Sequence, residues 1–274
     1  MVVDYWRRII HFTVDWVCCR YSTVSEDTER SEFAPVKHMI LKMILVLIGL
    51  WAVVSLGMLL WHIHAGQQVR RATKKYERTT SSAQRILLAG DSVIFGVGAT
   101  KPETSIAGLF GRDFPEASIT NIGVSGAEVD GLVTQLQSVH GQHFSIVVII
   151  IGANDVVHLA KLKQSLTNLD QALTLATQLA DQVVLMPEGN MGNAPIFPRV
   201  ASLLLTPRSQ QFRTGAIALA KQYGISYVDV FVKRDDDMWR RDVKKFYAAD
   251  FFHPADAGYL DWYTAIRAGM KAGV

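Results

Sequence analysis

Residues 86–92 read Ile-Leu-Leu-Ala-Gly-Asp-Ser, a short apolar run that ends at a glycine and two polar side chains. Four more short apolar runs follow, and one of them, residues 146–151, consists of β-branched residues. Such a run is typical of a strand that is buried on both faces. Segments with helical periodicity lie between the runs. Strands that alternate with helices predict a parallel sheet with helices on both of its faces.

The expected elements follow a simple order, in which each strand leads into a helix. We predict strands over residues 86–90, 118–122, 146–151, 183–186 and 225–230, and helices near residues 105–113, 127–138, 160–181, 208–223 and 256–271. In open parallel sheets, ligands bind at the carboxyl ends of the strands. A functional site is therefore expected in the loops that follow these strands.

The distinctive polar clusters of the chain fall after the predicted strands or just before the last helix. They are Gly90-Asp91-Ser92, the segment 121–126, Gly152-Ala153-Asn154-Asp155 and Asp250-Phe251-Phe252-His253-Pro254. Together they bring a serine, a histidine, carboxylates, an amide and several glycines to one edge of the sheet. These are the groups that acyl transfer requires.

Ser92 is the candidate nucleophile, because a serine hydroxyl attacks readily once an imidazole removes its proton. His253 is the candidate general base, and Asp250, three residues earlier, can fold back onto its Nδ1 and orient the ring. The oxyanion of the intermediate needs N–H donors that are already aimed at it. The backbone N–H groups of Ser92 and Gly126 and the side chain of Asn154 are the candidate donors.

These four clusters resemble the sequence blocks of the SGNH, or GDSL-type, hydrolases, in the family's order and at compatible distances. The resemblance covers about residues 84–272. It implies a flavodoxin-like three-layer α/β/α fold, no metal or organic cofactor, and hydrolysis of carboxylic esters or thioesters. It implies the same site residues, namely Ser92, Asp250 and His253 as the catalytic triad and Ser92, Gly126 and Asn154 as the oxyanion hole.

Two details of the resemblance concern single residues. Gly123 competes with Gly126 for the oxyanion role, and alignment on the family's Ser-Gly pair favours Gly126. Val93 stands where the usual signature has leucine, which is a mild apolar exchange. Ser92 itself has a structural alternative to the role of nucleophile, namely to cap the helix that follows the first strand.

An uncharged run of 19 residues, 43–61, predicts a transmembrane helix over residues 39–63. A helix of that length spans roughly 28 Å, close to the thickness of the hydrocarbon core of a bilayer. The alternative is a buried core helix. We expect residues 1–38 to form an amphipathic helix or a poorly ordered tail, followed by a linker. Residues 64–83 are expected to be a basic tether to a hydrolase domain over residues 84–274.

The distribution of charge bears on the membrane side and on partners. Five basic residues lie between Arg70 and Arg78 after the predicted span, and the positive-inside rule therefore favours a cytoplasmic catalytic domain in a single-pass protein. Lys37 and Lys42 count the other way, so an extracytoplasmic domain stays open.

The formal net charge is only +3, and the basic cluster lies beside an apolar run, which argues against a nucleic-acid partner. The two cysteines are adjacent, at residues 18–19, and predict neither a disulfide framework nor a thiolate metal site.

Several other polar residues are expected to be structural. Asp155 is expected to be a helix cap, and the acidic run 235–237, flanked by basic residues, predicts a solvated helix start. The loop 189–206 could line an acyl pocket, rest on a membrane or simply pack on the domain. Three histidines lack the spacing of metal ligands and are expected on the surface: His140, His143 and His158.

The function predicted from these observations is hydrolysis of carboxylic esters or thioesters through an acyl-enzyme on Ser92. An esterase or lysophospholipase-like activity on a small-molecule or lipid ester is the first hypothesis. The second keeps the triad in an acyltransferase or a deacetylase acting on a carbohydrate or a cell-envelope glycan. The third is a non-enzymatic membrane module, which would require a broken site. The sequence predicts neither the acyl chain length nor the oligomeric state.

Overall fold

The computed structural model describes residues 39–40, 42–47, 49–50, 53–54, 57, 64 and 66–270. The chain divides into two compact units, Met1–Leu59 and Leu60–Val274. Among the residues that are described, no helix has both the length and the apolar character needed to cross a bilayer. The predicted span at 39–63 lies only in part on described residues, and the predicted N-terminal segment 1–38 lies outside them, so both stay predictions.

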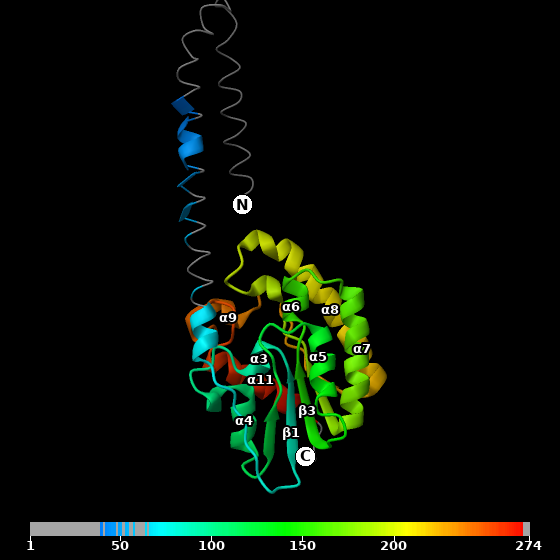
Figure 1. The fold of residues 1–274 in the computed structure, drawn as a ribbon. Helices are drawn as coiled ribbons and strands as arrows, with labels where there is room; N and C mark the ends of the chain where they lie inside the picture. Colours follow the sequence, from blue (N-terminus) through cyan, green and yellow to red (C-terminus); the bar gives the residue numbers. More distant parts are fainter. Residues whose placement is uncertain are drawn as a thin grey trace, which may run out of the picture. The chain divides into compact units, whose positions relative to one another are not determined.

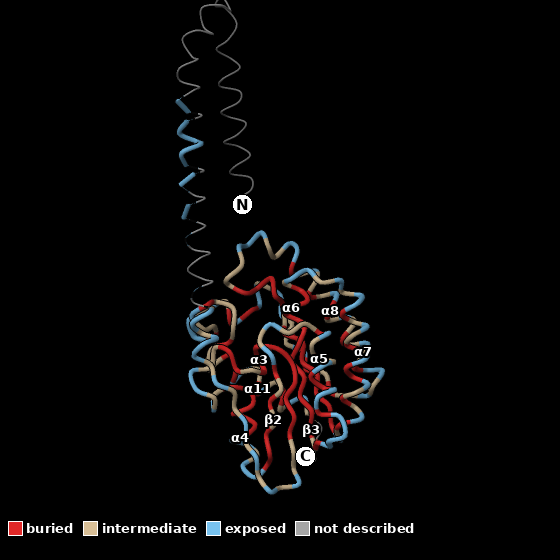
Figure 2. Tube along the Cα trace, viewed as in Figure 1, coloured by how far each residue is buried: buried red, intermediate tan, exposed pale blue. Residues whose placement is uncertain are grey.

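The second unit is built on a five-stranded parallel sheet in the order β2-β1-β3-β4-β5 (Figure 1). Its strands are β1 Arg85–Gly90, β2 Ser118–Asn121, β3 Phe144–Ile150, β4 Ala180–Met186 and β5 Ser226–Tyr227. The predicted parallel sheet and the location of all five strands are confirmed. The central strand β3 is buried along nearly its whole length, as its β-branched sequence indicates (Figure 2).

Helices cover both faces of the sheet and make two separate cores. On one face the core is formed with α5 Val129–Gln137, α7 Leu162–Leu179 and α8 Ser202–Tyr223. On the other face it is formed with α4 Ile106–Asp113 and α11 Asp256–Gly269. The result is the predicted arrangement of three layers. Shorter elements complete the domain: α3 Ser92–Phe95, η1 Pro102–Thr104, α6 Ala153–Val157, η2 Met191–Asn193, η3 Arg199–Ala201, α9 Met238–Arg241 and α10 Val243–Phe246.

The largest difference from the predicted elements lies at the start of α8. This helix begins at Ser202, whereas the sequence predicts a loop to about residue 206 and a helix from residue 208. Pro207 lies inside the helix. Proline lacks a backbone donor and is usually found in the first turn of a helix. A proline at residue 207 therefore favours a helix that begins later than Ser202. The remainder of the predicted loop contains the short 3₁₀ helices η2 and η3.

Part of the predicted tether contacts the domain. Arg78 pairs with Ile119 of β2 in an antiparallel bridge, with hydrogen bonds of 3.0 and 2.7 Å. Its guanidinium donates to the carbonyl oxygens of Gly111 at 2.9 Å, of Ala117 and of Phe114. These contacts hold the segment before β1 against α4 and β2. The predicted domain boundaries themselves stay a prediction.

Candidate active site

The turn after β1 carries Gly90, Asp91 and Ser92 to the carboxyl edge of the sheet. Gly90 has φ = +145°, and a Cβ there would lie 1.9 Å from the carbonyl oxygen of Ile150 on β3. The position therefore requires glycine. The side-chain amide of Gln135 on α5 accepts from the Gly90 N–H at 2.8 Å and donates to the Gly90 carbonyl at 2.9 Å. The turn is thus held from both sides at the point where Ser92 begins α3.

Ser92, His253 and Asp250 form one chain of hydrogen bonds. His253 Nε2 lies 3.0 Å from Ser92 Oγ, and His253 Nδ1 lies 2.6 Å from Asp250 Oδ2. Asp250 Oδ1 accepts from the backbone N–H groups of Phe252 and His253, each at 3.0 Å. Phe251 has φ = +58°, a left-handed conformation that is strained for a bulky residue and that turns the carboxylate back toward the ring. The structure therefore brings together the three side chains predicted as the triad.

The electrostatics of this chain suit proton transfer. Asp250 is buried, with 2% of its surface exposed. Burial raises the pKa of its carboxyl, but the hydrogen bond and charge of His253, with the two backbone donors, outweigh burial and hold the pKa below its ordinary value. Asp250 is therefore ionised at neutral pH, where its charge can stabilise an imidazolium on His253.

The predicted oxyanion donors lie around the same turn. The N–H of Ser92 is the first amide of α3 and has no acceptor within that helix. Gly126 lies in the loop after β2 and has φ = +85°, with open space where a Cβ would stand. The N–H of Val124 ties this loop to the Gly90 carbonyl at 3.0 Å. The N–H of Gly123 is already donated to Asn121 Oδ1 at 3.1 Å, which leaves Gly126 as the candidate donor of the two glycines.

The side-chain amide of Asn154 lies at the start of α6 and links two loops. Its Nδ2 donates to Asp91 Oδ2 at 3.1 Å and to the carbonyl oxygen of Ala127 at 2.9 Å. Both N–H groups of the amide are therefore engaged within the chain, and an oxyanion would have to take the place of one acceptor. Gly126 and Asn154 are not among the residues that line the cavity beside Ser92.

That cavity has a volume of about 490 Å³ and is lined by Ser92 and His253. Its walls also carry apolar and aromatic side chains, namely Val93, Met191, Ala194, Val230, Val232, Met238, Trp239, Tyr247, Phe252 and Trp262. Trp239 stacks on Trp262 with their ring centroids 4.9 Å apart. The volume falls in the range of ligand pockets, which are typically lined by apolar and aromatic side chains.

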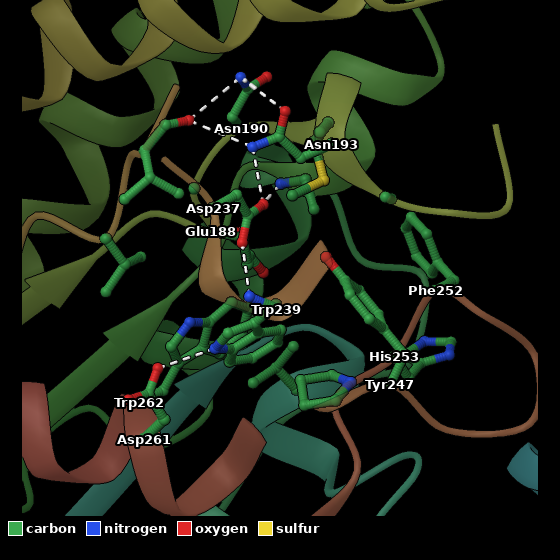
Figure 3. Close-up of a pocket in the computed structure, with 18 of the residues that line it drawn as sticks. Glu188, Asn190, Asn193, Asp237, Trp239, Tyr247, Phe252, His253, Asp261 and Trp262 are labelled. Carbon is green, nitrogen blue, oxygen red and sulfur yellow. Dashed lines mark hydrogen bonds between the residues drawn. The ribbon is translucent and has the colours of Figure 1, made fainter. Parts of the chain in front are cut away.

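The polar side chains of the cavity wall bond mainly to one another, as Figure 3 shows. Asn190 Nδ2 donates to Asn193 Oδ1 at 3.2 Å, and Asn193 Nδ2 donates to Asp237 Oδ2 at 2.8 Å. The indole N–H of Trp239 donates to Asp261 Oδ2 at 2.8 Å. Because these groups already have partners, most of the surface left to a ligand is apolar.

The prediction of a solvated acidic run was wrong for Asp237. This residue caps α9 through the N–H of Trp239, as expected of a helix start, but only 6% of its surface is exposed. The amide of Asn193, 44 residues earlier in the chain, satisfies its second carboxylate oxygen. The charged neighbours of Asp237 in the sequence predicted an exposed side chain. Its carboxylate is buried because Asn193, in the loop after β4, donates a hydrogen bond to it.

The remaining predicted structural residues behave largely as expected. His143 and His158 form exposed pairs with Asp181 and Glu128, and His140 is also exposed. Within the described part of the chain, no group of histidine, cysteine, aspartate and glutamate side chains could hold a metal ion. Asp155 accepts from the N–H of Val129 at 3.1 Å, so it caps the start of α5 rather than its own helix.

Sequence reasoning missed two groups that support the site. Gln135 holds the Gly90 turn, and Glu188, in the loop after β4, is a buried carboxyl that lines the cavity. Gln135 lies within an ordinary amphipathic helix and carries no local signal. Glu188 did carry one, since it follows an apolar strand at the same edge of the sheet as the four polar clusters.

Comparisons with known proteins agree with this geometry. Residues 88–260 match the model of the GDSL-like Lipase/Acylhydrolase family. No curated protein matches the chain by sequence.

Similar solved structures include a member of the lipolytic protein G-D-S-L family from Veillonella parvula, with 17% identity and a TM-score of 0.55 over 68% of this chain and 97% of that one. An acetylxylan esterase from Geobacillus stearothermophilus has 20% identity and a TM-score of 0.52 over 71% of this chain and 98% of that one. TesA has 19% identity and a TM-score of 0.55, over 69% and 98% of the two chains. At these identities the structural likeness shows the fold. The family match covers well over half of the chain, which therefore belongs to the GDSL-like lipase/acylhydrolase family and is an enzyme that acts on carboxylic esters.

Proposed function

We propose that the chain hydrolyses carboxylic esters through an acyl-enzyme on Ser92, with a medium or long acyl chain held in the adjoining cavity. The observation that carries this proposal is the hydrogen-bonded chain from Asp250 to Ser92, which opens onto an apolar cavity of about 490 Å³. Nucleophile, base and orienting carboxylate are within the distances that proton transfer requires.

In the first half of the reaction, Ser92 Oγ attacks the acyl carbon while His253 Nε2 takes the hydroxyl proton. The carbonyl π electrons move to oxygen, and the N–H groups of Ser92 and Gly126 stabilise the resulting oxyanion. Asn154 adds a third donor when one of its N–H groups turns from the Ala127 carbonyl to the oxyanion. Collapse of this intermediate breaks the bond to the leaving alcohol or thiol, which receives the proton from His253.

In the second half, water attacks the acyl-enzyme and gives one proton to His253. The second tetrahedral intermediate collapses, the bond from the acyl carbon to Ser92 Oγ breaks, and the proton returns from His253 to Oγ. The products are a carboxylic acid and the alcohol or thiol, so every proton is accounted for without a further co-reactant. Asp250 stays ionised throughout and offsets the charge of the imidazolium.

A fluorophosphonate probe tests the nucleophile. The full-length wild-type chain is expected to react covalently, because such probes trap an activated serine. Ser92→Ala should abolish the labelling, and Ser202→Ala, at a half-buried serine at the start of α8, should leave it unchanged. Labelling of the Ser92→Ala variant at the wild-type rate would contradict the assignment.

A series of p-nitrophenyl esters tests the role of the cavity. Each methylene that enters an apolar pocket contributes about 0.8 kcal/mol, which predicts a rise of roughly fourfold in kcat/KM per methylene until the cavity is full. Ala194 lines the cavity, so Ala194→Leu should shorten the optimal chain and spare acetyl esters. Ala218→Leu, at an exposed position of α8, is the matched control. A preference of the wild type for acetyl groups on a sugar would instead favour the carbohydrate deacetylase.

We also propose that residues 39–63 anchor the enzyme in a membrane, with the catalytic domain on the cytoplasmic side. The uncharged run at 43–61 supports the anchor, and its described residues are helical with exposed apolar side chains such as Leu47 and Val53. Resistance of the full chain to alkaline carbonate extraction is expected, and release would contradict the anchor. A C-terminal green fluorescent protein fusion should fluoresce, whereas an active alkaline phosphatase fusion would place the domain on the other side.

A further inference from the structure

Glu188 is a buried carboxyl group that takes no part in the proton transfers above. It follows β4, and Asp91 follows β1, so the two residues lie on either side of β3 at the carboxyl edge of the sheet. Asp91 and Glu188 are only 1% and 6% exposed. Glu188 Oε2 accepts from the backbone N–H of Ala153 at 3.1 Å. Glu188 is thus joined to the residue that directly precedes Asn154.

The second oxygen of Glu188 indicates where a proton lies. Glu188 Oε1 is buried and has no hydrogen-bond donor among the described residues, a costly position for an ionised carboxylate. Asp91, by contrast, accepts from the N–H of Val93 at 3.0 Å and from Asn154 Nδ2 at 3.1 Å. Glu188 and Asp91 share a side-chain hydrogen bond, which a proton on Glu188 lets it donate to Asp91.

The charges around the pair favour the same arrangement. Burial raises the pKa of Glu188 well above its ordinary value, and the negative charge of Asp91 raises it further. Burial also raises the pKa of Asp91, but the hydrogen bond with Glu188, the N–H of Val93 and the charge of His253 work against that rise. Of the two, Glu188 therefore holds the proton.

The other charged groups near the pair belong to the two cavities that Glu188 lines. In the cavity beside Ser92 the carboxylate of Asp237 is held by Asn193, and that of Asp261 by the indole N–H of Trp239. Asp236, Arg241 and His253 line the same cavity, and the charge of His253 and the buried hydroxyl of Tyr259 act on Asp91. Arg213 and Asp229 lie in a small second cavity and form an ion pair with each other. None of these groups supplies Glu188 Oε1 with a donor among the described residues.

We propose that Glu188 acts as a positioning residue, which donates a hydrogen bond to Asp91 and so fixes Asp91 as the acceptor that orients the Asn154 amide. The inference rests on the proposed role of Asn154 as an oxyanion donor. With one Asn154 N–H held on Asp91, only the N–H on the Ala127 carbonyl needs to move when the oxyanion forms. The contact from Ala153 to Glu188 fixes the backbone of the same loop.

A pH dependence follows from this arrangement. When Glu188 loses its proton, two carboxylates face each other in a buried site, and Asp91 can no longer be held by a donor from Glu188. The Asn154 amide is then free to turn, and the oxyanion loses part of its stabilisation. We therefore expect kcat to fall as pH rises through the pKa of the pair, while KM changes little, because the interaction matters in the transition state.

Three variants of the full-length chain in detergent test the proposal, with kcat and KM measured from pH 6 to 10, about the range in which the triad stays competent. Glu188→Gln keeps a donor for Asp91 and an acceptor for Ala153 and cannot ionise, so it should retain most of the wild-type kcat and lose the alkaline fall. Glu188→Ala should lower kcat by about 10- to 100-fold at every pH with KM little changed. The matched control is Gln182→Ala at the opposite end of β4, a buried side chain that also lacks partners among the described residues, and it should leave the wild-type profile unchanged.

Two results would overturn the inference. One is a Glu188→Gln profile with the same alkaline fall as the wild type, and the other is a Glu188→Ala kcat within about twofold of the wild type. Should Glu188→Ala fail to fold, the Glu188→Gln profile alone decides. Failure of the proposed function can be distinguished from failure of this inference. In that case the Ser92→Ala variant would keep its activity, whatever the activity of the Glu188 variants.

Discussion

The substitution Asp250→Asn tests the hydrogen-bonded chain on which the mechanism depends. Asparagine has the shape of aspartate, and its carbonyl oxygen can still accept the backbone N–H groups of Phe252 and His253, now 3.0 Å from Asp250 Oδ1. The amide nitrogen then takes the place of Oδ2, 2.6 Å from His253 Nδ1. Because this nitrogen is a donor, it favours the imidazole tautomer with the proton on Nε2.

The size of the effect follows from that tautomer. A proton on Nε2 prevents His253 from accepting the proton of Ser92, whose Oγ lies 3.0 Å away, and the imidazolium also loses its counter-charge. In a serine protease triad the same exchange lowers kcat by about 10⁴, which corresponds to roughly 5.5 kcal/mol of activation free energy. We expect a loss of this order here. The free energy of unfolding should fall by no more than about 3 kcal/mol, the value of one charge-assisted hydrogen bond.

Steady-state hydrolysis of a p-nitrophenyl ester by the full-length chain measures the effect. The matched control is Asp256→Asn, since Asp256 accepts from the N–H of Thr100 at 2.8 Å and from Thr104 Oγ1 at 2.7 Å, but does not contact His253. Its kcat should stay within about threefold of the wild type. The reasoning is refuted if Asp250→Asn keeps a kcat within about tenfold of the wild type while its circular dichroism spectrum is unchanged.

Three further predictions concern the support of the site. Gly90→Ala places a Cβ 1.9 Å from the carbonyl oxygen of Ile150 at φ = +145°, so urea denaturation should show a loss of at least about 3 kcal/mol, and a smaller loss would contradict the close approach. Gln135→Leu leaves the Gly90 N–H without its acceptor, and we expect a loss of about 1–3 kcal/mol and a lower rate of fluorophosphonate labelling, whereas unchanged labelling would argue against a role in holding the turn. The raised pKa of Glu188 means that the folded chain binds more protons than the unfolded chain above the ordinary pKa of a glutamate, so wild-type stability should fall as pH rises through the folded pKa. The urea midpoint of Glu188→Gln should not show that fall with pH. If the midpoints of the two chains change with pH in parallel, the fall does not come from Glu188.

The sheet was predictable because its signals are local. A run such as residues 146–151 can be read as a buried strand without knowledge of its neighbours, and β3 Phe144–Ile150 confirms it. The start of α8 was not predictable from local signals, because Pro207 is unfavourable inside a helix by any sequence rule. At the start of α8, Leu205 is buried in the core and Thr206 Oγ1 donates to Asn190 Oδ1 at 2.9 Å, and these contacts offset that preference.

The triad side chains could be predicted to meet because the carboxyl ends of parallel strands share one edge of a sheet. The strained backbone at Phe251, which turns the Asp250 carboxylate toward His253, could not be predicted, since φ > 0 is unfavourable for phenylalanine. The burial of Asp237 was missed for a related reason. The burial of Asp237 depends on a hydrogen bond from the amide of Asn193, and no pattern in the sequence around residue 237 predicts that contact.

Glu188 shows where the same edge-of-sheet argument could have been carried further. Three of the four clusters that predict the site were chosen because polar residues follow apolar strands, and Glu188 also follows one, β4. A lone glutamate after a strand is usually solvated, so its position alone could not distinguish a surface residue from a buried acid. The distinction depends on its neighbours in space, since Asp91 lies 97 positions earlier in the chain and already accepts two hydrogen bonds. A carboxyl group that must share this pocket with an ionised aspartate has to keep its proton or leave the interior. Its place in the wall of the cavity, bonded to the residue before Asn154, is therefore consistent with a protonated carboxyl group that positions the oxyanion donors.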